Sequence, residues 1–221
     1  MTIALAVTGS NLCGDRPFSA ALRRADGAIA TAHSPAGERG DLAVLCRELC
    51  RDAGVAPEQL RHVVVDVGPG SYTGLRVAVT FVRFLQRFGD CSVEAVDSLA
   101  LLAHHVVGSR GDAASVRVLL DARRGRYHAA RFAVTGGTLR ELEAAAAVET
   151  DAALAAIAAE DVVVAPAPLL TQLGPLLHQR SAAGVVAAGL GAEALFAAGL
   201  PRRAATVDDL EPRYLMASYA G

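Results

Sequence analysis

The sequence predicts an α/β protein in which three consecutive strands precede alternating helices and strands. Of its 221 residues, 52% are hydrophobic and 5% are aromatic, a composition typical of a folded protein rather than a disordered one. Residues 2–8, 17–23 and 27–31 have the apolar composition of short strands, and Asp26-Gly27 predicts a hairpin turn between the last two. A doubly wound sheet would instead alternate helices and strands from the start.

A first helix is expected at residues 41–53, where apolar residues recur at helical spacing until Gly54 ends the pattern. Those apolar residues are Leu42, Leu45, Cys46 and Leu49. A strand at 63–67, a helix at 75–88, a strand at 92–96 and a helix at 97–107 follow. This order matches the first lobe of the actin-like, or ribonuclease-H-like, ATPase fold.

The second half of the chain begins in a similar way. Strands are expected at 116–120, at 126–134, briefly around Leu139, at 162–165 and at 185–188, with alanine-rich helices at 151–159 and 192–198. We interpret this half as a smaller, degenerate copy of the first. The predicted organisation is therefore an actin-like first lobe over residues 1–108 and a second lobe with a C-terminal tail over 109–221.

A glycine-rich turn joins the predicted strand at 63–67 to the helix at 75–88. Such a turn is either a phosphate site, because backbone N–H groups and the helix dipole converge there, or a structural turn, and the spacing alone does not decide. The residues of this candidate phosphate-binding turn are Gly68, Gly70, Ser71, Thr73 and Gly74. The chain contains no lysine, so a P-loop is excluded.

The helix at 75–88 has more apolar surface than one sheet can cover. Its polar side chains Arg76, Thr80, Arg83 and Arg87 form one stripe joined only by Gln86, and apolar residues cover the rest. The helix is therefore either buried inside its own domain or shared with another chain.

Residues 68–76, GPGSYTGLR, closely resemble the G-P-G-S-[FY]-T-G-L-R signature of the TsaB (YeaZ) family. Two weaker matches follow in the family's order. Residues 119–127, LLDARRGRY, resemble its L-D-A-R-x-G-E-V-Y, and residues 211–215, EPRYL, resemble its closing P-x-Y-L. The family supplies the dimerisation subunit of the bacterial machinery that makes threonylcarbamoyladenosine in tRNA.

This resemblance implies a non-catalytic subunit that pairs with a TsaD-like catalytic subunit through the helices at 41–53 and 75–87. A TsaE-like ATPase would join the assembly, and the chain alone would form a homodimer. The resemblance implies that the chain has no cofactor of its own and that the partner subunits bind ATP and a metal. The partner-binding residues expected on these helices are Leu42, Leu45, Cys46, Leu49, Leu75, Val79, Val82 and Arg83.

The chain departs from the family pattern in two places. Relatives commonly read I-D-T-S after the first strand, whereas Thr8 stands here in place of the acid, which argues against nucleotide hydrolysis because divalent cations prefer carboxylates. The family's H-S-E aligns with Glu38-Arg39-Gly40, and His33-Ser34 lies upstream. Two alternatives stay open: a nucleotide-binding or metal-dependent peptidase-like enzyme of the same fold, or a divergent dimerising relative without a tRNA role.

Other chemistry has weaker support in the sequence. No serine nucleophile elbow surrounds Ser71, and the four cysteines form no C-x-x-C pair, so neither a serine hydrolase nor a metal site is predicted. Asp66, Asp97 and Asp121 could converge as an acid cluster, although a helix cap explains Asp97 and a turn explains Asp121.

Charge and hydropathy limit which partners and which cellular location the chain can have. A formal net charge of −2 predicts that any contact with tRNA is at most indirect. The N-terminus lacks a basic head and a cleavage site, and no apolar run is long enough to span a membrane. We therefore expect a cytoplasmic protein without a membrane partner.

Overall fold

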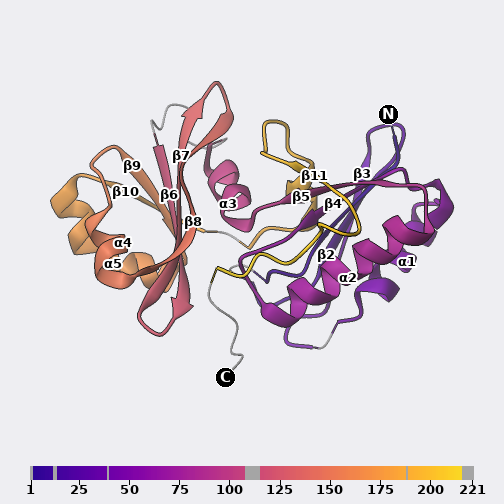
Figure 1. Ribbon diagram of the computed structural model, residues 1–221, viewed down its shortest axis with the longest axis horizontal. Coiled ribbons are helices and arrows are strands. Elements are labelled where there is room, and N and C mark those ends of the chain that lie inside the picture. The colour runs from indigo at the N-terminus through magenta and orange to yellow at the C-terminus, as the bar shows by residue number, and fades with distance from the viewer. Residues whose placement is uncertain (1, 12–13, 39, 108–114, 188, 216–221) are drawn as a thin grey trace. The chain divides into compact units, whose positions relative to one another are not determined.

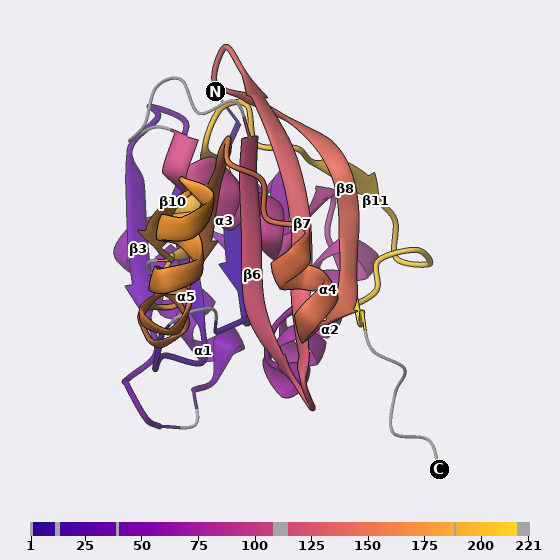
Figure 2. The same ribbon diagram turned by 90° about the vertical axis from the view of Figure 1, so that its left-hand side faces the viewer.

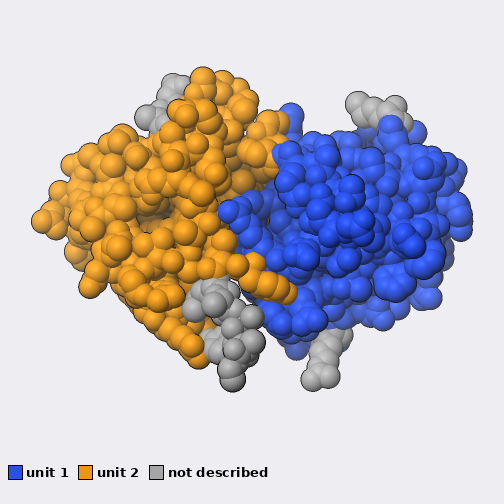
Figure 3. All heavy atoms as spheres, viewed as in Figure 1, with its two compact units in different colours: residues 1–98, 189–198, 202–213 blue, residues 99–188, 199–201, 214–221 orange. Residues whose placement is uncertain are grey.

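The computed structural model describes residues 2–11, 14–38, 40–107, 115–187 and 189–215. The chain forms two compact units, coloured separately in Figure 3. The first contains residues 1–98, 189–198 and 202–213, and the second contains residues 99–188, 199–201 and 214–221. This division differs from the expected boundary at residue 108, because two C-terminal segments return to the first unit and residues 99–107 belong to the second.

The first unit is built on a six-stranded sheet in the order β11-β5-β4-β1-β2-β3 (Figure 1). Its strands are β1 (Ala4–Thr8), β2 (Ser19–Arg23), β3 (Ile29–His33), β4 (His62–Asp66), β5 (Ser92–Val96) and β11 (Arg203–Ala205). The first three strands are antiparallel neighbours, and β4 and β5 then run parallel to β1. The antiparallel pairing of β11 with β5 explains why the C-terminal segment returns.

Helices α1 (Leu42–Asp52) and α2 (Tyr72–Phe88) cover one face of this sheet and contact each other. Their buried side chains form one apolar core with residues such as Leu5, Val63 and Val65. The 3-10 helix η2 (Ala192–Phe196) contacts β1 and β2 from the opposite face, where the Ser19 hydroxyl accepts the Ala192 N–H at 2.9 Å. A second 3-10 helix, η1 (Pro57–Gln59), precedes β4.

The second unit repeats the strand order of the first. Its five-stranded sheet has the order β10-β9-β6-β7-β8, which corresponds strand for strand to β5-β4-β1-β2-β3 and has the same directions. The strands are β6 (Ser115–Arg123), β7 (Arg126–Thr135), β8 (Thr138–Glu149), β9 (Asp161–Ala165) and β10 (Ala183–Val186). The unit also holds α4 (Thr150–Ala155), α5 (Ala167–Arg180) and, apart from Ser98, α3 (Ser98–Val107).

Figure 2 shows α4 and α5 over one face of this second sheet. A separate apolar core lies beneath them and includes Leu119, Val163, Leu169, Leu173 and Leu177. Each unit therefore has its own sheet, its own helices and its own core.

Most predicted elements lie within a few residues of the observed ones. Helix α1 begins after Asp41, whose carboxylate accepts the Val44 N–H at 3.1 Å, and β5 has the expected bounds. The larger differences lie in the second half of the chain. Helix α5 was not predicted, the strand expected briefly around Leu139 runs over Thr138–Glu149, and the helix expected at 192–198 is the short η2. The strand β11 was also not predicted, and α4 is shorter than the helix expected at 151–159.

Candidate functional site: the glycine-rich turn and the exposed side of helix α2

The glycine-rich turn lies against the loop that follows β1. A Cβ atom on Gly74 would stand 1.9 Å from the Gly9 carbonyl oxygen, and one on Gly70 would stand 2.6 Å from the Ser10 carbonyl oxygen. The Ser71 N–H donates to the Ser10 carbonyl at 2.8 Å, and the Ser71 hydroxyl caps α2 by accepting the Gly74 N–H at 3.2 Å. Close approach of two backbones therefore explains why glycine occupies positions 70 and 74.

Asp66, the last residue of β4, is buried and anchors this turn. Its carboxylate accepts three hydrogen bonds, from the Thr8 hydroxyl at 2.8 Å, the Gly68 N–H at 2.9 Å and the Ser98 hydroxyl at 2.5 Å. A hydroxyl at position 8 can donate to this carboxylate, whereas a second carboxylate would repel it. Thr8, which replaces the acid common in the family, therefore forms a hydrogen bond to Asp66 that an ionised acid could not donate.

The candidate phosphate-binding residues have structural roles in the turn. Gly70 and Gly74 pack against the loop after β1, Ser71 is the helix cap, and Thr73 is exposed. These contacts favour the structural interpretation of the turn, and phosphate binding there stays a prediction.

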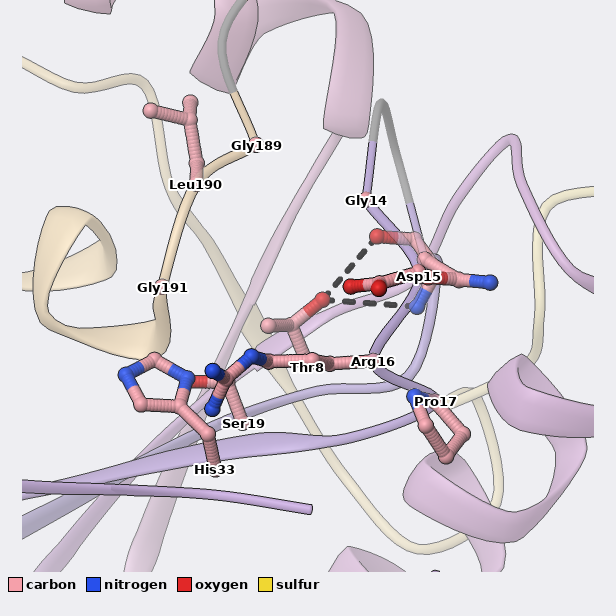
Figure 4. Close-up of a pocket in the computed structure, with 12 residues that line it drawn as sticks. Thr8, Gly14, Asp15, Arg16, Pro17, Ser19, His33, Gly189, Leu190 and Gly191 are labelled. Atoms are coloured by element: carbon pink, nitrogen blue, oxygen red, sulfur yellow. Dashed lines mark hydrogen bonds between the residues drawn. The ribbon is translucent and has the colours of Figure 1, made fainter. Parts of the chain in front are cut away.

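A pocket of about 360 Å³ with a mixed polar and apolar lining lies beside Thr8 in the first unit (Figure 4). The loop after β1 and residues 189–191 form its walls, and Asp15, Arg16 and His33 are among its lining residues. The Thr8 oxygen lies 2.9 Å from the Ser10 hydroxyl and accepts the Ser10 N–H at 3.3 Å. Together with these hydroxyls, the described lining residues include only one acidic side chain, Asp15, whereas a divalent cation is usually held by several carboxylate and carbonyl oxygens.

The three aspartates that could have formed one acid cluster each have different hydrogen-bond or ion-pair partners. Asp97 forms an ion pair with the Arg213 guanidinium, and the Arg213 backbone N–H donates to the Val67 carbonyl at 2.7 Å. The C-terminal family motif therefore contacts Val67, the residue between β4 and the GPGSYTGLR turn. Asp121 accepts the Arg123 N–H at 2.7 Å, as expected of a turn residue.

The structure buries most of the expected partner-binding residues. Six of the eight side chains are buried in the core of the first unit, and Leu45 and Arg83 are partly buried. The six are Leu42, Cys46, Leu49, Leu75, Val79 and Val82. A side chain already packed against the sheet cannot also form a free contact surface. Pairing through α1 and α2 stays a prediction, and of the eight expected residues only Leu45 and Arg83 keep exposed surface on these helices.

The outer side of α2 exposes a different set of apolar residues. Val77, Phe84 and Phe88 are 39%, 59% and 80% exposed and recur at i, i+7 and i+11, so they form one stripe, here called the α2 apolar row. The rings of Phe84 and Phe88 stack with centroids 5.7 Å apart. The sequence held this signal, because these residues follow directly after Arg76, Arg83 and Arg87 in a second row of the same spacing.

Arginines and one tyrosine border the α2 apolar row. The Arg76 guanidinium lies 5.3 Å from the centre of the Tyr72 ring and donates to the Tyr72 hydroxyl at 2.7 Å. Arg87 is exposed and Arg83 is half-buried. An exposed apolar centre with a polar, cationic border is the arrangement typical of a protein-binding surface.

A comparison with known families matches residues 39–215, well over half of the chain, to the family described as "TsaD: tRNA N6-adenosine threonylcarbamoyltransferase". The chain belongs to the TsaD family. Within it the chain is of the TsaB/YeaZ type, as the GPGSYTGLR motif indicated. The tRNA threonylcarbamoyladenosine biosynthesis protein TsaB of Bacillus subtilis (strain 168) is 35% identical over 94 residues. That match spans 42% of this chain and 40% of the relative.

Solved structures confirm the actin-like fold of this TsaB/YeaZ-type chain. YeaZ from Pseudomonas aeruginosa superposes with a TM-score of 0.73 at 22% identity, covering 96% of this chain and 100% of YeaZ. A second Pseudomonas aeruginosa structure, described as similar to peptidase YeaZ, gives a TM-score of 0.73 at 23% identity and covers 98% of this chain and 100% of its own.

Within the described ranges, no three histidine, cysteine, aspartate or glutamate side chains are grouped so that they could hold a metal ion. No helix in the described part of the chain is long and apolar enough to cross a membrane.

Proposed function

We propose that this chain is a non-catalytic subunit required for threonylcarbamoyladenosine modification of tRNA, and that it pairs with and activates a TsaD-like catalytic subunit. Membership of the TsaD family and the name of the Bacillus subtilis relative support the pathway. The observation that carries the pairing role is the α2 apolar row of Val77, Phe84 and Phe88.

The energetics of this row favour a protein partner. Transferring an exposed phenylalanine side chain into an interface stabilises the complex by roughly 1.5–3 kcal/mol. Phe84 and Phe88 lie side by side, so one complementary pocket can accommodate both rings. Tyr72 and the arginines at 76, 83 and 87 would then form the polar rim and set the orientation of the partner.

The contribution of the chain would be to hold the catalytic subunit in a productive conformation. ATP and a metal would be bound by the partner subunits, and a TsaE-like ATPase would join the assembly. In the absence of the catalytic subunit, the same row would join two copies of the chain.

A second candidate function is nucleotide binding by the chain itself, and the pocket beside Thr8 is the observation that favours it. Against this candidate, position 8 carries a neutral hydroxyl that donates to Asp66, and not a carboxylate that could hold a metal ion. Isothermal titration of the isolated chain with ATP and magnesium separates the two candidates, because tight binding would favour the second.

Size-exclusion chromatography with light scattering tests the pairing role. The chain is measured alone and mixed with the TsaD-like protein of the same genome. We expect a one-to-one mixed complex to replace a homodimer. Phe84→Glu and Phe88→Glu should each weaken that complex by at least about tenfold, because a charge is buried without a partner.

Leu142→Glu is the matched control, because Leu142 is another exposed apolar residue and lies in the second unit. It should leave the complex intact. Mass spectrometry of tRNA nucleosides from cells carrying each variant provides the functional readout. If Phe84→Glu and Phe88→Glu pair normally and support normal threonylcarbamoyladenosine levels, the proposal is wrong.

A further inference from the structure

The β3 strand is an open edge of the first sheet. Within the described part of the chain it pairs only with β2, and it is the last strand in the order β11-β5-β4-β1-β2-β3. Edge strands are usually protected by charges, prolines, bulges or short length. β3 (IATAH) has no acid, arginine or proline and pairs with β2 without a register shift over five residues. The opposite edge, β11, is only three residues long and begins with Arg203.

The register identifies the backbone groups that β3 presents outward. Hydrogen bonds from the Arg24 N–H to the Ala28 carbonyl (2.9 Å) and from the Ser34 N–H to the Phe18 carbonyl (3.0 Å) fix the alternation of the β2–β3 ladder. The backbone N–H and C=O groups of Ile29, Thr31 and His33 therefore point away from β2. Among the described residues, no backbone group forms a hydrogen bond with them.

A groove of about 430 Å³ runs between β3 and α1 in the same unit. Ala30, Ala32 and Leu45 give it an apolar floor, and Ile29 at its edge is 47% exposed. A strand added beside β3 would direct every second side chain toward α1 and into this groove.

The charge along the groove is acidic. Glu48 and Asp52 line it from α1 at i and i+4, and Arg24 is its only cation among the lining residues. Arg24 is paired with Asp26 at 3.2 Å, and Asp52 is paired with Arg51 at 3.0 Å. Glu48 has no ion pair with any described residue, so an incoming cation would meet a carboxylate without a competing partner.

We propose that the β3 edge and the groove beside α1 bind an extended, basic peptide segment of another protein by strand addition. The backbone of the peptide would pair with Ile29, Thr31 and His33. Its groove-facing side chains would be small and apolar, with one arginine or lysine opposite Glu48. Main-chain hydrogen bonds provide affinity in this mode of recognition, and the side-chain pockets provide specificity.

The test uses the full chain and two synthetic peptides, acetyl-TVTRTVT-amide and the same peptide with glutamate in place of arginine. Both have β-forming residues, and they differ only in the charge of one groove-facing position. Backbone amide signals are followed by NMR during titration. We expect the arginine peptide to shift the signals of residues 29–33 and to protect the amides of Ile29, Thr31 and His33 from hydrogen exchange. The glutamate peptide should bind roughly fivefold more weakly.

Two variants address the two parts of the proposal. Glu48→Arg should reverse the preference, so that the glutamate peptide binds better than the arginine peptide. Glu58→Arg, an exposed acid outside the groove, is its control and should leave the preference unchanged. Thr31→Pro removes an outward N–H without removing a β2–β3 hydrogen bond, and it should weaken both peptides by about tenfold.

The Glu48→Arg result decides the proposal even if Thr31→Pro does not fold. Binding that shifts only signals outside β3 and α1 would overturn the proposal. A preference for the arginine peptide that survives Glu48→Arg unchanged would also overturn it. Absence of any shift in residues 29–33 at millimolar arginine peptide would also overturn it.

Discussion

Asp66 is the residue on which the turn between β4 and α2 depends. It is buried, and its carboxylate accepts hydrogen bonds from Thr8, Gly68 and Ser98. We expect Asp66→Ala to lower the free energy of unfolding of the first unit by roughly 3 kcal/mol or more, since it leaves three buried donors without an acceptor. Urea denaturation followed by NMR signals of the first unit measures this loss.

Thr8→Val tests one of those hydrogen bonds separately. It removes the hydroxyl that donates to Asp66 at 2.8 Å, and it should cost less than Asp66→Ala. Asp208→Ala, at an exposed aspartate of the same unit, is the control and should have little effect. A similar loss for Asp208→Ala and Asp66→Ala would contradict the assigned role.

Helix α2 has two apolar rows with different tasks. Leu75, Val79 and Val82 are buried against the sheet, whereas Phe84 and Phe88 are exposed. Val79→Asp and Val82→Asp should therefore each destabilise the first unit by roughly 4 kcal/mol or more, because they bury a charge without a partner. Circular dichroism during thermal unfolding should show this loss, and Phe84→Glu should unfold near the temperature of the parent chain.

The periodicity of α2 predicted an excess of apolar surface but did not show which apolar residues are covered. An apolar stripe at helical spacing has the same appearance in the sequence whether it meets a sheet, a second chain or solvent. Helix α5 was missed for another reason. Pro166, Pro168 and Pro175 suggest an interrupted segment, yet Leu169, Leu173 and Leu177 at i, i+4 and i+8 bury one face and maintain the helix.

At the scale of the whole molecule, the second unit is distinguished by a buried ion pair. The second unit buries Arg117 and Asp161, which form an ion pair at 3.1 Å. Burial alone would raise the pKa of Asp161, but hydrogen bonds from the Ala158 N–H, Ser115, Arg117 and Arg131 outweigh it and lower the pKa below its ordinary value of 3.8. The Arg117 hydrogen bond likewise lowers the pKa of Glu143.

These lowered pKa values predict acid sensitivity of the second unit. A carboxylate with a lower pKa in the folded state binds fewer protons when folded, so its stabilisation is present above the ordinary pKa and is lost as the pH falls through the folded value. We expect the urea midpoint of the second unit to fall more steeply than that of the first between pH 5 and about pH 3. NMR signals assigned to each unit measure the two midpoints separately.

Asp161→Asn is the matched variant for this prediction. It leaves Arg117 and Arg131 without the buried carboxylate, and it should destabilise the second unit by roughly 3 kcal/mol near neutral pH while reducing its dependence on acid. Equal acid sensitivity of both units in the parent chain would show that the ion cluster is not responsible.

The sequence by itself determined the local elements and the family. Strand composition, helical spacing and caps such as Asp41 and Ser71 act between residues close in the chain, so they can be recognised without a fold. The tertiary structure decided which apolar row of α2 is free. It also showed that Gly74 faces Gly9 and that Arg213 returns to Val67. These contacts join segments far apart in the sequence, and the burial they produce depends on the packing of the entire unit.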